Sequence, residues 1–166
     1  MGKFTMTHEI NCDVDTFWKT FFDKTFNEKL YREALGFPSF DVVAQNDTDK
    51  SITRTVKGTP KMEVPGALAK LLGNNFGYTE EGTFDKGTKT WRWKLTPSTL
   101  ADKIRNVGMV RVEPVGDNKV RRTAEVEVEA KVFGVGGLLE STAEKQLRQG
   151  WDESAVFMNK YIQTTR

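Results

Sequence analysis

The sequence has very few cysteine and histidine residues: Cys12 is its one cysteine and His8 its one histidine among 166 residues. A single cysteine excludes an internal disulfide, and the two residues together are too few to ligate a zinc ion. We therefore expect no disulfide, no metal site and no bound cofactor. The lack of disulfides also favours a reducing, cytoplasmic location.

The chain also lacks a long apolar run and a strong excess of one charge. No segment provides the roughly 20 apolar residues that a membrane-spanning helix needs, and the N-terminus does not resemble a signal peptide. Lys and Arg number 25 against 23 Asp and Glu, without the basic excess typical of nucleic-acid binders. We expect no nucleic-acid partner, and no obligate protein partner is evident.

Apolar periodicity is what the sequence does contain, and it predicts one globular domain over residues 1–166. Strict alternation predicts a strand over 3–12, and apolar spacings of three and four predict helices over 14–22 and 25–35. A long amphipathic helix is predicted over 134–163. Between them, alternating segments separated by turn signals predict six strands: 39–46, 50–58, 76–86, 88–96, 104–115 and 118–132.

Two segments, HEINCDVDTFW (8–18) and VFGVGGLLE (132–140), stand at the first strand–helix junction and at the entry to the last helix. With the element order, they make the chain resemble the START-like superfamily of polyketide cyclases, pollen allergens and lipid-transfer domains. The resemblance implies an α+β helix-grip fold, in which a curved antiparallel sheet of seven strands wraps a long C-terminal helix. It also implies a cavity for a hydrophobic ligand between sheet and helix.

Polar residues on apolar strand faces are candidates for contacting a ligand in such a cavity. Arg54 and Glu80 occupy such positions on neighbouring strands, where a buried charge needs a partner or water. We predict that they orient the polar group of a ligand; an exposed pair near the strand ends is the alternative. The other predicted ligand-binding residues, for which ordinary core packing is the alternative, are Tyr78, Phe84, Trp91, Trp93, Ala124, Val126, Ala143, Leu147, Trp151 and Ala155.

His8 is a weak candidate for catalysis. Histidine is the residue type most often used as a general acid or base, but no nucleophile or acid partner can be placed beside it in the sequence. A structural role is therefore the alternative interpretation.

A loop over 59–73 contains a short apolar helix that begins at Pro65 and ends at Gly73. We predict that this segment covers the cavity as a lid. Transient contact with a membrane surface and packing on the chain's own domain are the alternatives. The apolar residues of the predicted lid are Met62, Val64, Leu68, Leu71 and Leu72.

Three classes of function remain open at this stage. The sequence favours binding or transport of a hydrophobic small molecule, such as a lipid, an isoprenoid or a polyketide, over catalysis. One alternative is a cyclase-like or dehydratase-like enzyme in which His8, Glu80 or Tyr78 moves a proton. The other is a regulatory or co-chaperone-like module that binds proteins through its surface. A fold resemblance does not choose between these classes.

Overall fold

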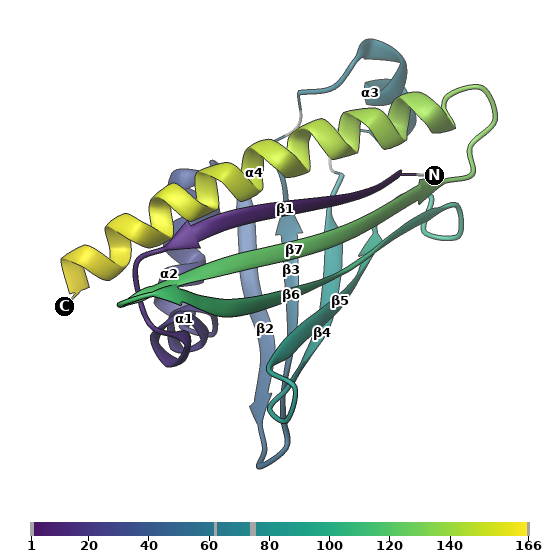
Figure 1. The fold of residues 1–166 in the computed structure, drawn as a ribbon. Helices are drawn as coiled ribbons and strands as arrows, with labels where there is room; N and C mark the ends of the chain where they lie inside the picture. The colour runs from purple at the N-terminus through teal and green to yellow at the C-terminus, as the bar shows by residue number, and fades with distance from the viewer. Residues whose placement is uncertain (1, 62, 74–75, 166) are drawn as a thin grey trace.

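The computed structural model describes residues 2–61, 63–73 and 76–165, and its centre is a curved antiparallel sheet crossed by a long C-terminal helix (Figure 1). The strands are β1 (Gly2–Ile10), β2 (Ser39–Asp47), β3 (Ser51–Thr59), β4 (Tyr78–Asp85), β5 (Thr90–Pro97), β6 (Ile104–Gly116) and β7 (Lys119–Ala130). The helices are α1 (Val14–Phe21), α2 (Lys24–Lys29), α3 (Gly66–Leu72) and α4 (Gly136–Thr165), with a π-helix η1 (Leu30–Ala34). The predicted helix-grip arrangement is confirmed.

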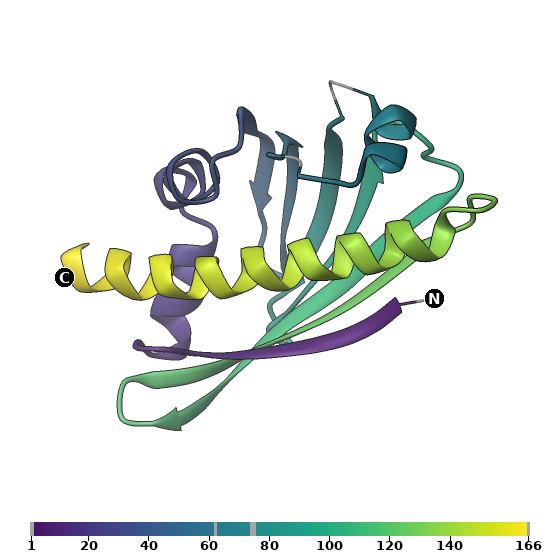
Figure 2. The same ribbon diagram turned by 90° about the horizontal axis from the view of Figure 1, so that it is seen from above.

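The seven strands follow the order β1-β7-β6-β5-β4-β3-β2, so the first and last strands of the chain are neighbours. Helix α4 packs along β1 and β7 and also contacts η1, which lies beside β2 at the other edge of the sheet (Figure 2). Strands β3, β4 and β5 lie farther from α4, which β5 reaches through the side chain of Trp93. Among the described residues, no helix has both the length and the apolar character to cross a membrane.

The region predicted as one helix over 25–35 consists of two different helical segments. Asp23 caps α2 by accepting a hydrogen bond from the Thr25 N–H (3.0 Å). The backbone then widens into η1, where the Leu35 N–H donates to the carbonyl of Leu30 (2.9 Å). π-Helical turns are rare and occur frequently at functional sites. The π-helix η1, which the sequence did not predict, is therefore a candidate for part of a functional site.

Two glycines on the concave face of the sheet allow tryptophan rings to lie flat against it. The ring of Trp91 covers Gly82 on the neighbouring strand, and the ring of Trp93 covers Gly108. A Cβ atom at either glycine would overlap the ring. Glycine in a strand interior commonly marks a bend or a close approach, and here it permits the indole rings to form the floor of the concave face.

Buried apolar residues form two separate clusters on this side of the sheet. The larger cluster lies where α1, α2 and the C-terminal half of α4 meet the sheet, and includes Phe17, Trp18, Phe26, Met158 and Ile162. The smaller one joins α3 to β7 and the start of α4 through Leu68, Leu72, Ala130 and Leu139.

We expect Gly82→Ala to destabilise the fold by about 1–3 kcal/mol, because the new methyl group would force the Trp91 ring out of its packed position. The free energy of unfolding, measured by urea denaturation, tests this expectation.

Gly150→Ala is the matched control, since Gly150 lies within α4 and has no atom near its vacant Cβ position. This substitution should stabilise the protein by about 0.5–1 kcal/mol, the helix propensity difference between the two residues. Equal effects of the two substitutions would contradict the proposed contact between Trp91 and Gly82.

Candidate ligand-binding site

Aromatic side chains from α1 fill one part of the space above the sheet. Trp18 contacts Phe84 with ring centroids 4.4 Å apart, and Phe21 contacts Trp91 at 5.5 Å. Phe84 and Trp91 are consequently 6% and 2% exposed. In this state, these two predicted ligand-binding residues lie in packed core and offer almost no surface to a ligand.

Arg54 connects this aromatic region to β3, the strand next to the edge strand β2. Its Nη1 donates a hydrogen bond to the carbonyl of Phe21 at the end of α1 (2.9 Å). Its guanidinium also lies over the rings of Phe21 and Trp91, 4.8 and 4.9 Å from their centroids. Arg54 is 5% exposed, and burial lowers its pKa. This arginine therefore fixes α1 to the sheet as well as bringing a positive charge into the interior.

Glu80 lies close to Arg54 but does not contact it directly. Arg54 is opposite Gly82 in the β3–β4 register and Glu80 is opposite Val56, so the two charged residues are diagonal neighbours on the concave face. Among the described residues, no hydrogen-bond or ion-pair partner is found for the Glu80 carboxyl. Burial raises the pKa of Glu80, and the charge of Arg54 offsets this only in part.

Two tyrosines border the same charged pair. Tyr78 lies two residues before Glu80, with its ring against Gly58, and burial raises its pKa well above the usual range. Tyr31 projects from η1 and stacks on Phe40, with ring centroids 4.0 Å apart. Burial, followed by the charge of Glu80, raises the pKa of Tyr31 to about 12. We name Tyr31, Arg54, Tyr78 and Glu80 the central polar cluster.

Sequence reasoning missed Tyr31 as a member of the site. It places Tyr31 on the apolar face of a helix over 25–35, beside Phe26 and Leu30, where an aromatic ring indicates core. Its hydroxyl was the available signal, because that face has few other polar atoms and a buried hydroxyl needs a partner. The π-helical turn of η1 that places Tyr31 against Phe40 of β2 has no recognisable sequence signal.

Several residues near the cluster lie deep among protein atoms yet keep accessible surface. Tyr31, Tyr78 and Glu80 combine both properties. A deep side chain with accessible surface borders space that water can enter. Other half-buried residues packed against the same core are Leu95 on β5 and the predicted residues Ala143, Leu147 and Trp151 on α4. By contrast, four further predicted residues, each at most 7% exposed, lie in the core: Trp93, Ala124, Val126 and Ala155.

A second polar network joins β1 and β7 to α4. Arg122 donates through Nη1 to the hydroxyl of Ser154 (3.1 Å) and through Nη2 to the carbonyl of Trp151 (2.9 Å). Its Nη2 also lies 3.0 Å from Nδ1 of His8, whose Nε2 is 2.6 Å from the carboxylate of Asp152. Because Arg122 can only donate, His8 accepts at Nδ1 and donates at Nε2 as a neutral imidazole. Both ring nitrogens are thus engaged by protein groups, which favours a structural role for His8.

Trp151 links this network to the floor of the concave face. The Trp151 ring stacks on Trp93, with ring centroids 5.9 Å apart. The Arg122 guanidinium lies 4.8 Å from the centroid of the Trp151 ring. Trp93 donates to the side-chain oxygen of Asn106 (3.4 Å). Trp93 and Trp151 therefore bridge sheet and helix.

The short helix of the predicted lid is present as α3, between Pro65 and Gly73. Leu68 and Leu72 are 1% and 6% exposed and pack in the smaller apolar cluster, which Val64 and Leu71 border. Met62, the remaining predicted lid residue, lies outside the described residues. In this state α3 is docked on β7 and α4.

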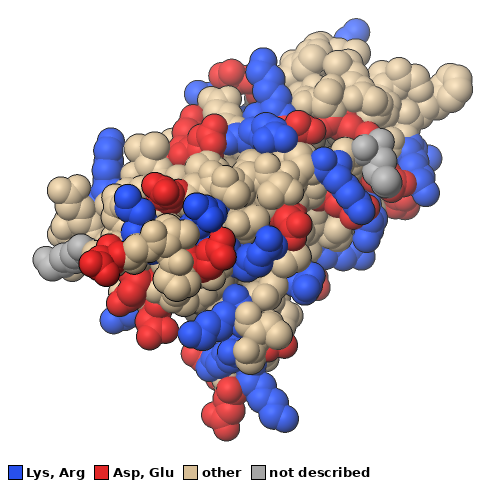
Figure 3. Space-filling model, in the orientation of Figure 1, with Lys and Arg blue, Asp and Glu red and all other residues tan. Residues whose placement is uncertain are grey.

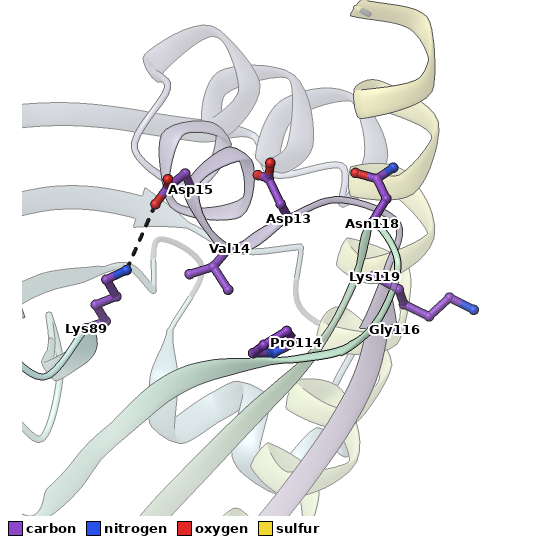
Figure 4. Close-up of a pocket in the computed structure, with 8 residues that line it drawn as sticks. All are labelled: Asp13, Val14, Asp15, Lys89, Pro114, Gly116, Asn118 and Lys119. Atoms are coloured by element: carbon purple, nitrogen blue, oxygen red, sulfur yellow. Dashed lines mark ion pairs between the residues drawn. The ribbon is translucent and has the colours of Figure 1, made fainter.

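The surface carries hollows that are less suited to an apolar ligand. One, of about 310 Å³, lies between the start of α1 and the β4–β5 and β6–β7 turns, where Asp15 and Lys89 approach to 4.0 Å (Figure 4). Basic and acidic residues alternate over the face that carries α4 (Figure 3). Among the described residues, no cluster of three or more His, Cys, Asp or Glu side chains could hold a metal ion.

Comparisons with known proteins agree with the observed architecture. A family model described as "Protein of unknown function (DUF2505)" matches residues 5–162. A START superfamily protein from Mycobacterium smegmatis is 11% identical, with 99% of both chains covered and a TM-score of 0.63. The ZhuI aromatase/cyclase from Streptomyces sp. R1128 is 8% identical, with 96% of this chain and 92% of that chain covered and a TM-score of 0.64.

Norcoclaurine synthase from Thalictrum flavum, solved in complex with dopamine and hydroxybenzaldehyde, is 12% identical. The match covers 99% of this chain and 88% of that chain, with a TM-score of 0.68. No match is found among curated proteins. At these identities the solved structures establish the START-like fold, and they leave open which molecule the chain binds.

We expect Glu80→Gln to stabilise the protein at neutral pH. Burial raises the pKa of Glu80 in the folded protein above that in the unfolded chain, so the folded state holds this proton more tightly. The resulting contribution to the free energy of unfolding is fully present below the usual pKa of a glutamate. It is lost as the pH rises through the raised pKa. Glutamine does not ionise, so the substitution should raise the urea midpoint at neutral pH and leave it unchanged in acid.

Glu81→Gln provides the control, because Glu81 is the next residue on β4 and is exposed on the other face. An identical pH dependence of the two variants would mean that Glu80 is solvated.

Proposed function

Because the chain belongs to the DUF2505 family and has the START-like fold, we propose that it binds a hydrophobic small molecule between the sheet and α4. Binding or transport, and not a surface-mediated role, is the function that its interior supports best. The ligand would be of lipid, isoprenoid or polyketide type, with an apolar body and a small polar end.

The central polar cluster is the observation on which this proposal rests. A carboxyl group without a partner among the described residues and two tyrosine side chains lie deep among protein atoms and keep accessible surface. Leaving such groups unpaired is costly, so proteins rarely bury them unless another molecule completes their hydrogen bonds. Half-buried Leu95, Leu147 and Ala143 would provide the apolar walls. An apolar pocket with a few convergent polar groups is the usual form of a small-molecule site.

An enzyme that moves a proton within the same space is the second candidate. Glu80, a carboxyl group with a raised pKa near two tyrosine hydroxyls, is the specific observation that favours it. His8 fits this role less well, because both of its ring nitrogens are already engaged. If a co-purified ligand is identified, incubating it with the protein and following its mass spectrum would reveal turnover, which Glu80→Gln should abolish.

We expect Ala143→Trp to abolish ligand uptake while the fold is retained. Ala143 is half-buried on α4 and packs against the core, so an indole ring there would occupy the proposed binding space. Native mass spectrometry of freshly purified protein, followed by organic extraction, would detect the ligand as an adduct on the wild-type chain and its loss in the variant.

Lys145→Trp adds the same ring two residues away, at an exposed position of α4, and should leave the adduct intact. A wild-type protein that carries no adduct and takes up no added amphiphile would argue against a binding function. Equal uptake by the two tryptophan variants would place the ligand elsewhere.

A further inference from the structure

The balance of charge in the central polar cluster restricts the ligand that it can accept, provided that the proposed binding function is correct. Arg54 contributes one positive charge and Glu80 one negative charge when it is ionised. Each stabilises the charged form of the other, yet no ion-pair contact joins them. With Glu80 ionised the cluster is therefore formally neutral, while its two charged groups remain incompletely hydrogen-bonded.

Both charged groups keep hydrogen-bonding capacity that the described residues do not use. Arg54 directs Nη1 to the Phe21 carbonyl, whereas its Nη2 forms no hydrogen bond with the described residues and is not among the fully buried atoms, unlike Nε. Glu80 has acceptor oxygens and no donor among those residues. The cluster thus offers donors on β3 and an acceptor on β4, at diagonal positions of one sheet face.

We propose that the ligand binds through an uncharged hydroxyl group, of an alcohol or a phenol, which donates to Glu80 and accepts from the Arg54 side of the cluster. A hydroxyl group is both a donor and an acceptor, so it can hydrogen-bond to the Glu80 carboxylate and to the Arg54 guanidinium at the same time. The hydroxyls of Tyr31 and Tyr78 can each act as donor or acceptor, and so can complete the hydrogen bonds around the ligand hydroxyl.

Charged head groups fit this environment less well. A carboxylate could pair with Arg54 but would place a second negative charge beside Glu80. An ammonium group could pair with Glu80 but would face the permanent charge of Arg54, which the rings of Phe21 and Trp91 already surround. Either ion would leave a net charge in a desolvated interior, where an unbalanced charge is expensive.

A matched naphthalene series tests this specificity on the full chain. The four probes share the same ring and a short saturated arm, which ends in a hydroxyl, a carboxylate, an ammonium or a methyl group. Dissociation constants would be measured by calorimetry at mildly alkaline pH, which favours the ionised form of Glu80. The hydroxyl probe should bind about tenfold more tightly than the methyl probe and more tightly than either ion.

Glu80→Gln provides the decisive variant, because it removes the negative charge and leaves Arg54 unbalanced. The affinity for the carboxylate probe, relative to that for the hydroxyl probe, should rise about tenfold or more. Glu81→Gln, on the exposed face of the same strand, should leave the order of affinities unchanged. Circular dichroism of both variants would confirm that they are folded.

The outcomes separate this inference from the function on which it rests. Binding of all four probes with equal affinity would overturn the hydroxyl preference and keep the hydrophobic site. Tightest binding of the carboxylate or the ammonium probe to the wild type would also overturn the preference. Failure of every probe, including the methyl probe, would overturn both the preference and the proposed binding function.

Discussion

A close fit between glycine and tryptophan shapes the interior of this protein. Trp91 and Trp93 lie flat on the sheet because Gly82 and Gly108 have no side chains beneath them. The rings form a floor from which Trp93 reaches the Trp151 ring on α4. The stacked indoles thus help to set the distance between sheet and helix.

Polar groups in this interior have two different roles. Arg122 is enclosed by Ser154, His8 and the carbonyl of Trp151, so it joins β1, β7 and α4 as a structural connection. Glu80 has no such partner among the described residues and keeps accessible surface. An unsupported buried carboxyl costs stability, and under the proposed function a bound molecule would complete its hydrogen bonds. This contrast separates the groups that hold the fold from those that could recognise a ligand.

Much of the fold was predictable because its signals are local. Alternation in residues 118–132 and helical spacing in residues 134–163 each report which face is buried, and the structure has β7 and α4 there. The inward positions of Arg54 and Glu80 follow from the same alternation. It could not reveal that Phe84 and Trp91 pack against α1, because that contact depends on how a distant helix docks. Tyr31 was missed for a related reason, since the π-helical turn of η1 has no local sequence signal.

The sequence by itself determined the order of the elements and the face of each strand that lies inside. These two features follow from periodicity and from turn and capping residues such as Asp13 and Asp23, which act over a few positions. The helix-grip arrangement was implied by the resemblance to the START-like superfamily. Only the tertiary structure decided which inward residues became packed core and which kept accessible surface. It also decided that Arg54 would hydrogen-bond to the carbonyl of Phe21 without contacting Glu80, because such choices depend on distances between elements far apart in the chain.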